Sequence, residues 1–240
     1  MQSDQGADLY TLYYAPDNAS LVIRVVLEEI GAAYNTWLVD RTAREQESEA
    51  YRKLNPAGLI PVCIIDGEPV FETAAIALTL ADRHGQLAPA PQSSDRPAFL
   101  KWLFFLSNTL HPDLRQLFYP QKFIDPDPAT LSMHARKTRN RLEAHFGILE
   151  ALYSGFDHPF LLGAEPTIFD IYAGLCLRWP QLYPAGSPPA FVPADYPVLS
   201  RMLQALEVRP SFKRAFEAEG IPAPFLSEAR PCDGSLGSPV

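Results

Sequence analysis

The stretch NPAGLIPVCIIDGEPVFETAAIALTLADRHG, residues 55–85, decides the fold. Pro61 stands at the entrance of a short apolar strand, which the turn pair Asp66-Gly67 closes into a tight hairpin. The return strand covers 69–71, and a helix covers 73–85 and stops at a glycine. A proline that opens a strand ends the sheet ladder at that point. The stretch therefore predicts a strand, a hairpin, a second strand and a helix, with backbone groups available beside Pro61.

The sequence before this stretch also alternates strands and helices. An aromatic strand, Leu9–Tyr14, precedes a helix that Ser20 can cap and that ends at Gly31. A second strand covers 34–39, and a polar helix covers 42–54. The order β-α-β-α-β-β-α over residues 1–85 predicts an α/β domain.

The sequence after this stretch has no strand signal. Residues 86–95 have the composition of a linker, residues 96–226 predict an all-helical domain, and the proline- and glycine-containing residues 227–240 predict a flexible tail. Thr167 and Asp170 have capping-box spacing, so we expect them to begin a buried helix in a structural role. The expected helices are 96–119, 129–153, 168–183, 196–207 and 210–219.

The composition narrows the classes of partner. Net charge is −8 and no long apolar run exists, which argues against nucleic-acid binding and against a membrane span. The first ten residues lack a basic segment followed by an apolar one, so we expect a cytoplasmic protein. The three cysteines have no CxxC spacing, so we expect no disulfide framework and no metal site.

Two motifs make the chain resemble the cytosolic glutathione S-transferases, nearest to the bacterial beta-like and theta-like classes. The first is Asn55-Pro56-Ala57-Gly58-Leu59-Ile60-Pro61, followed by the hairpin and by Glu72-Thr73, and the second is Gly163-x-x-x-Thr167-x-x-Asp170. The resemblance covers about residues 8–225. It implies a thioredoxin-like N-terminal domain, a helical C-terminal domain and a homodimer.

The resemblance also implies where glutathione binds. A peptide ligand can pair with free backbone groups at a sheet edge, and Leu59, Ile60 and Pro61 would supply them if the Ile60–Pro61 bond is cis. Glu72 and Thr73 stand at a helix N-terminus, which suits the carboxylate of the γ-glutamyl group. Thr73 would donate a hydrogen bond to that carboxylate, and Glu72 would pair with the ammonium group.

The residue that activates the glutathione thiol is expected just after the first strand. Beta-class members have a reactive cysteine where this chain has Ala19, so the chain departs from the class and cysteine-dependent chemistry is not expected. Ser20 stands four residues before Arg24, as in classes that use a serine hydroxyl, and is our first candidate. The competing role of Ser20 is a helix cap.

Other candidates for this role are also open. Asn18 is the second, because its amide can donate a hydrogen bond to sulfur. Tyr14 and Tyr13 come next, since some classes use a tyrosine at the end of this strand, although packing in an aromatic strand is the alternative.

The helix 96–119 is expected to form one wall of the cleft. His111 matches a beta-class histidine that faces the ligand, and Asn108 lies three residues earlier on the same face. Pro112 follows His111, so the helix is expected to bend there. Aromatic residues of this region would hold an apolar co-substrate, although most are expected in the core.

Three functions are consistent with these observations. The first is a detoxifying glutathione transferase that presents the thiolate to a small hydrophobic electrophile, with glutathione as co-substrate and no metal. The second is a glutathione-dependent disulfide reductase or ether-cleaving lyase, which uses the same bound thiol. The third is a protein of this fold that binds glutathione or another ligand without turnover.

Overall fold

The N-terminal half is built on a four-stranded mixed sheet. The computed structural model describes residues 10–237, so Leu9, the expected start of the first strand, lies outside the described residues. The strands are β1 (Tyr10–Tyr14), β2 (Tyr34–Leu38), β3 (Val62–Ile65) and β4 (Glu68–Phe71), in the order β2-β1-β3-β4. β1 is parallel to β2 and antiparallel to β3, and β3 and β4 form the hairpin. This is the predicted thioredoxin-like arrangement.

The helices of this half follow the prediction with one difference. α1 (Ser20–Ile30) and α3 (Thr73–His84) end at Gly31 and Gly85, both at positive φ, as expected of C-terminal glycines. The segment 42–54 forms two short helices, η1 (Glu45–Glu47) and α2 (Glu49–Leu54), rather than one. Ser48 separates them because its extended backbone ends η1 and its hydroxyl accepts the N–H of Tyr51, which caps α2.

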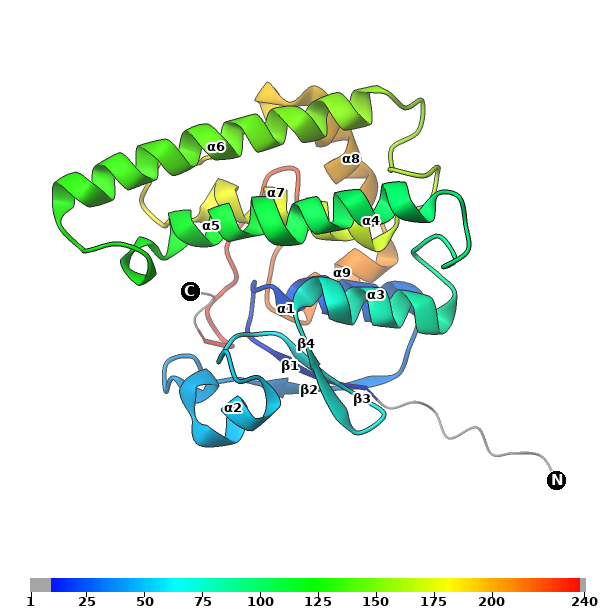
Figure 1. Ribbon diagram of the computed structural model, residues 1–240, viewed down its shortest axis with the longest axis horizontal. Coiled ribbons are helices and arrows are strands. Elements are labelled where there is room, and N and C mark those ends of the chain that lie inside the picture. Colours follow the sequence, from blue (N-terminus) through cyan, green and yellow to red (C-terminus); the bar gives the residue numbers. More distant parts are fainter. Residues whose placement is uncertain (1–9, 238–240) are drawn as a thin grey trace.

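The C-terminal half is a layer of helices over α1 and α3, as Figure 1 shows. α1 packs against α7 and α9, and α3 also packs against α7, so one apolar core runs through both halves. The elements of this half are α4 (Arg96–Phe105), η2 (Leu106–Leu110), α5 (His111–Phe118), η3 (Pro120–Lys122), α6 (Pro128–Ser154), α7 (Ile168–Leu182), η4 (Pro193–Asp195), α8 (Pro197–Glu207) and α9 (Pro210–Glu217).

The helix predicted over 96–119 is interrupted just before Pro112. The five residues of η2, between α4 and α5, form a π-helical turn. Proline lacks an N–H and its ring clashes with the carbonyl four residues earlier, so a widened turn accommodates it. This turn carries Asn108, and His111 follows it directly.

Two polar residues that resemble helix caps have different roles. The sequence suggested that Ser20 caps α1, and this is wrong. The Ser20 hydroxyl instead donates to the carbonyl of Ala15 at 3.0 Å and accepts the N–H of Ala15 at 3.2 Å. The predicted capping box of α7 is confirmed: Asp170 accepts from both the N–H and the hydroxyl of Thr167, each at 2.7 Å. Both Thr167 and Asp170 are buried, in agreement with a structural role.

The segment after α9 is held to the helical layer. Ser227 hydrogen-bonds to Glu207, Ala229 donates to Gln181, and the carbonyl of Arg230 accepts from Arg178. This differs from the flexible tail predicted over 227–240, because the side chains that hold the segment lie on α7 and α8, far away in sequence. Residues 238–240 of that prediction lie outside the described residues.

Candidate functional site

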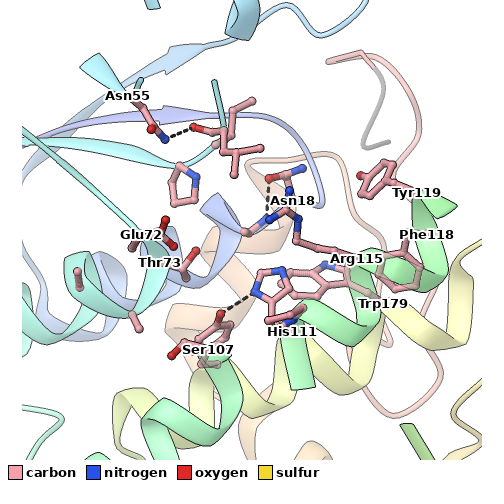
Figure 2. A pocket seen from close by; sticks show the side chains of 18 of the residues that line it. Asn18, Asn55, Glu72, Thr73, Ser107, His111, Arg115, Phe118, Tyr119 and Trp179 are labelled. Carbon is pink, nitrogen blue, oxygen red and sulfur yellow. Dashed lines mark hydrogen bonds between the residues drawn. The ribbon is translucent and has the colours of Figure 1, made fainter. Parts of the chain in front are cut away.

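A cavity of about 520 Å³ lies between the two halves. Its walls come from the β1–α1 loop, the segment before β3, the start of α3, and helices α4, α5 and α7. Figure 2 shows Glu72 and Thr73 on one side, and Phe118, Tyr119 and Trp179 on the other. All seven residues predicted to bind glutathione line this cavity, as does one of the four catalytic candidates, Asn18; the seven are Leu59, Ile60, Pro61, Glu72, Thr73, Asn108 and His111.

The segment before β3 is fixed in place from behind. The Ile60–Pro61 peptide bond is cis, as predicted. The carbonyl of Leu59 accepts hydrogen bonds from the Asn55 amide at 2.8 Å (Figure 2) and from the Tyr51 hydroxyl at 2.9 Å. Among the described residues, none hydrogen-bonds to the backbone of Ile60. The loop is thus anchored at Leu59, while Ile60 presents its backbone beside the cavity.

Gly58 explains why this loop needs a glycine. Its φ is +63°, and a Cβ there would lie 3.0 Å from the carbonyl oxygen of Gln46. A side chain would therefore be strained and crowded at the same time. The Asn-Pro-x-Gly part of the motif thus builds the loop, and the residues after it face the cavity.

Glu72 and Thr73 stand at the N-terminus of α3. Glu72 precedes the helix with φ of +72°, in the left-handed region that non-glycine residues seldom adopt. No described residue pairs with the Glu72 carboxylate or hydrogen-bonds to the Thr73 hydroxyl. The unpaired N–H groups of the first turn add partial positive charge at the same place. This corner offers a hydroxyl, amide donors and a carboxylate within one turn.

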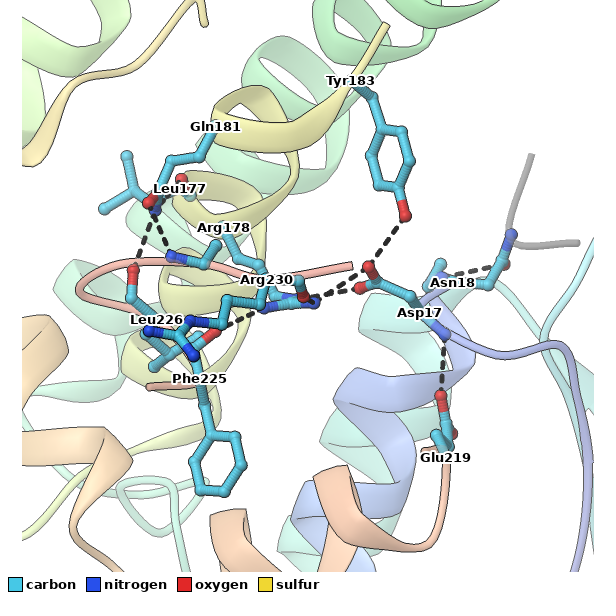
Figure 3. Close-up of polar contacts among 12 residues, drawn as sticks. Asp17, Asn18, Leu177, Arg178, Gln181, Tyr183, Glu219, Phe225, Leu226 and Arg230 are labelled. Atoms are coloured by element: carbon cyan, nitrogen blue, oxygen red, sulfur yellow. Dashed lines mark hydrogen bonds and ion pairs between the residues drawn. The ribbon is translucent and has the colours of Figure 1, made fainter. Parts of the chain in front are cut away.

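The β1–α1 loop is held by a buried ion pair. Asp17 has φ of +47° and is 3% exposed, and its carboxylate pairs with Arg178 of α7 at 2.9 and 3.0 Å. The hydroxyl of Tyr183 also donates to Asp17 at 2.9 Å, and the Asp17 N–H donates to Glu219. Figure 3 shows these contacts meeting at Asp17, beside Asn18. The loop that carries Asn18 is therefore fixed by the helical half.

Asn18 and Ala19 face the cavity from this loop. The side-chain oxygen of Asn18 accepts the N–H of Ala19 at 2.8 Å, which orients the amide. Ala19, at the position of the beta-class cysteine, supplies only a methyl group. The three cysteines do not line the cavity, and burial raises the pKa of the Cys63 thiol to about 12.

Ser20, Tyr14 and Tyr13, the other three catalytic candidates, lie outside the cavity, and the Tyr13 ring stacks on Trp37 with the centroids 5.9 Å apart. The Ser20 side chain is completely buried, and its hydroxyl is engaged at both ends by the backbone of Ala15. Tyr14 is 7% exposed and packs beneath the guanidinium of Arg24, 4.4 Å from the ring centroid. Ser20 was the first candidate because it stands four residues before Arg24, but this spacing does not show in which direction the Ser20 hydroxyl points. Of the four candidates, only Asn18 lines the cavity.

His111 contributes a neutral imidazole. Its Nδ1 lies 2.6 Å from the hydroxyl of Tyr172, and its ring lies 5.3 Å from that of Trp179. Burial, and secondarily the positive charge of Arg115, lowers the pKa of His111 to about 4. A neutral ring in this wall can hydrogen-bond a ligand without adding charge.

The cavity also has cationic residues that sequence reasoning did not identify. Arg41, Arg115 and Lys122 line it, together with the aromatic rings of Phe118 and Tyr119. Arg115 lies one turn after His111, so the helical spacing of four was the signal available in the sequence. No comparable pattern points to Arg41 or Lys122, since both lie outside the long helices. Within residues 10–237, no group of three His, Cys, Asp or Glu side chains is arranged to hold a metal ion.

Known proteins share both the domain and the complete fold. The sequence profile described as glutathione S-transferase, N-terminal domain, matches residues 9–82. A glutathione S-transferase of Xanthomonas campestris is 27% identical over 212 residues, which span 88% of this chain and 98% of that protein. The structure of a sphingomonad glutathione S-transferase complexed with glutathione has a TM-score of 0.72 and 29% identity, and covers 88% of this chain and 100% of its own.

A third similar structure is a glutathione transferase of Burkholderia graminis. It has a TM-score of 0.76 and 27% identity over 90% of each chain, and it is described with two glutathione molecules bound per subunit. With the matched profile, the strand order and the cis-proline cavity, these similarities define the N-terminal half as a glutathione S-transferase N-terminal domain. Residues 9–82 therefore match this domain, as the first motif predicted, and most of the chain is similar to glutathione S-transferases.

Proposed function

We propose that this protein is a glutathione transferase, which binds glutathione in the cavity between its halves and activates its thiol. The observation that carries the proposal is that all seven predicted glutathione-binding residues line one cavity. They come from the loop before β3, the junction of β4 and α3, the π-helical turn and the start of α5, which are separated by up to about fifty residues. The similar structures with bound glutathione support the same ligand.

The backbone of Ile60 suits the middle of the tripeptide. Because no described residue occupies its N–H and C=O, a bound peptide can pair with them as an additional strand. The γ-glutamyl group then reaches α3, where Thr73 and the first-turn amides bind its carboxylate and Glu72 pairs with its ammonium. Opposite charges of the ligand are thus matched within one helix turn.

The β1–α1 loop supplies the residue that activates the glutathione thiol. Asn18 lines the cavity, and its amide N–H groups are donors that stabilise a thiolate. The thiol proton passes to solvent, the thiolate sulfur forms a bond to the electrophilic carbon, and the leaving group departs with its bonding electrons. His111, which is neutral, can hydrogen-bond the bound tripeptide from the opposite wall. The fixed positions of both residues lower the cost of organising the site.

The test is a pH titration of bound glutathione, followed by the ultraviolet absorbance of its thiolate. We expect the thiol pKa to fall at least about one unit below the ordinary value of about 8.5. Asn18→Ala should raise this pKa and lower kcat about tenfold or more, whereas Ser20→Ala should leave the pKa of the bound thiol within a few tenths. An unshifted pKa in the unaltered protein would indicate a binding protein without transferase activity.

Disulfide reduction is a second candidate, favoured by the size of the cavity and by the two glutathione molecules in the Burkholderia graminis relative. The bound thiolate would attack one sulfur of a mixed disulfide, form a new disulfide and release the other sulfur as a thiol. No protein cysteine lines the cavity to take part. Turnover of a small disulfide, without conjugation of any electrophile, would favour this candidate over the first.

The assembly and location of the protein are part of the same proposal. We propose a homodimer in the cytoplasm that acts on a small electrophile in detoxification, as the family resemblance implies. No helix within residues 10–237 is long and apolar enough to cross a membrane. Light scattering on the purified protein tests the dimer, since a single-chain mass at micromolar concentration would contradict it.

A further inference from the structure

Positive charge is concentrated on the helical wall of the cavity. Arg115 on α5 and Lys122 at the end of η3 both line it, although the chain carries a net charge of −8. The Lys122 ammonium lies 5.0 Å from the centroid of the Tyr119 ring, so it is directed along an aromatic surface. Burial, with the positive charges of Arg115 and Arg41, lowers the pKa of Lys122, and the Glu47 carboxylate opposes this only in part. Arg115 and Arg41 are therefore close enough to Lys122 to repel its positive charge.

Within residues 10–237, Arg115 differs from most other arginines because it has no carboxylate as an ion-pair partner. No described carboxylate forms an ion pair with Arg115 or Lys122. Most other arginines that contact the core or a domain boundary have such a partner within 3 Å: Arg24 with Glu219, Arg83 with Asp66, Arg96 with Asp82, Arg141 with Asp113, Arg178 with Asp17, Arg209 with Glu29 and Arg214 with Glu28. Arg115 is thus a half-buried cation that faces a cavity.

The acidic residues of the cavity do not neutralise this wall. Asp17 is occupied by Arg178, and Glu47 is paired with Arg44. Glu72 lies on the opposite side, at the start of α3, as Figure 2 shows. A ligand anion placed against α5 therefore meets the positive charge of Arg115, which forms no ion pair with a described carboxylate, while the Glu47 carboxylate acts on Lys122 without an ion pair. A hydrogen bond from the Arg115 guanidinium to a ligand carboxylate would be charge-assisted, and such bonds are stronger than those between neutral groups.

Apolar rings lie next to the cations. Phe118, Tyr119 and Trp179 line the same cavity, and Figure 2 shows them on the same side of it as Arg115. We propose that the second substrate is an aromatic electrophile that carries a carboxylate, with the ring on this aromatic surface and the carboxylate on Arg115, assisted by Lys122. This inference rests on the proposed glutathione transferase function and specifies its substrate class.

The experiment compares two electrophiles that differ by one charge. A chlorodinitrobenzene and the corresponding chlorodinitrobenzoate undergo the same reaction: the thiolate sulfur bonds to the ring carbon and chloride leaves with the bonding electrons. Each kcat/KM is divided by the uncatalysed rate with glutathione. We expect the unaltered protein to prefer the carboxylate compound, and Arg115→Gln to lower that preference about tenfold, equivalent to about 1.4 kcal/mol. Higher ionic strength should weaken the preference.

The control is Arg136→Gln, which makes the same change at an exposed arginine of α6 outside the cavity. It should leave both rates unchanged. Glutathione affinity is measured in all three proteins by calorimetry, because the cations can instead serve a carboxylate of glutathione itself. If Arg115→Gln weakens glutathione binding and lowers both rates equally, the inference is overturned while the proposed function stands. If the unaltered protein binds no glutathione, the proposed function and the inference both fail.

Discussion

Replacing Arg178 with methionine should destabilise the protein and also disturb thiol activation. Arg178 is completely buried and donates to Asp17, to the carbonyl of Phe225 at 2.5 Å and to that of Arg230 at 2.6 Å (Figure 3). Arg178→Met keeps most of the side-chain volume and removes all these donors. The carboxylate of Asp17 would keep only the hydroxyl of Tyr183 as a side-chain partner.

The size of the effect follows from this loss. Removing one member of a buried ion pair costs about 3–5 kcal/mol, because the remaining charge is left without compensation. The carbonyls of Phe225 and Arg230 would also lose their donor. This adds less to the loss of stability than the full cost of a buried unpaired carbonyl, because the segment after α9 can move toward water. We therefore expect the free energy of unfolding to fall by about 4 kcal/mol. In the double variant Asp17→Asn/Arg178→Met, no carboxylate charge is left unpaired. Its loss of stability should therefore be at least about 1 kcal/mol smaller than the sum of the losses in the two single variants.

The assay is urea denaturation followed by tryptophan fluorescence, with the thiol pKa of bound glutathione as a second measurement. Arg136→Met, at an exposed position, should change stability by less than about 0.5 kcal/mol. Because Asp17 precedes Asn18, Arg178→Met should also raise the pKa of the bound thiol. A loss of stability below about 1 kcal/mol, or fully additive single and double variants, would refute the reasoning.

Three further predictions concern packing, protonation and ligand binding. Gly147→Ala should stabilise α6 by about 0.5–1 kcal/mol in urea denaturation, because a Cβ meets no atom within 4 Å, whereas Gly174→Ala should destabilise by about 1–2 kcal/mol, because its Cβ lies 2.8 Å from Leu206. His111 has a pKa of about 4 in the folded state and about 6.5 in the unfolded state, so between these pH values the unfolded state binds more protons and the stability from this group is lost as pH falls. His111→Gln should remove this contribution. If the free energy of unfolding changes as much between pH 4 and pH 7 in His111→Gln as in the unaltered protein, the prediction is wrong. Thr73→Val should weaken glutathione binding about tenfold by calorimetry, whereas Thr79→Val, exposed on the same helix, should not.

The side of the cavity that we propose binds glutathione was predictable because its geometry is local. Pro61, the hairpin and Glu72-Thr73 lie within one short stretch, where the spacing of turn residues and the strand–helix junction determine which groups face outward. The helical half was predicted as helices, but its π-helical turn was recognisable only as an expected bend at Pro112. Local sequence therefore determined the elements and one wall of the cavity.

The catalytic candidate and the cationic wall depend on contacts between distant segments. Ser20 and Asn18 both follow the first strand, and only the fold shows that the Ser20 hydroxyl turns back to Ala15 while Asn18 faces the cavity. The direction of this loop is determined by Asp17 and Arg178, which are 161 residues apart. No periodicity in the sequence reveals such a pairing. The role of a side chain was therefore harder to predict than its position along the chain.

The segment after α9 is joined through one arginine to the β1–α1 loop, which carries Asn18. Arg178 binds the carbonyls of Phe225 and Arg230 with the same guanidinium that holds Asp17. A protein shortened before residue 225 would lack both acceptors, even though every cavity-lining residue would remain in the sequence. Purification tags and fusion partners are therefore better placed at the N-terminus, and an enzyme engineered for small size should keep this segment intact.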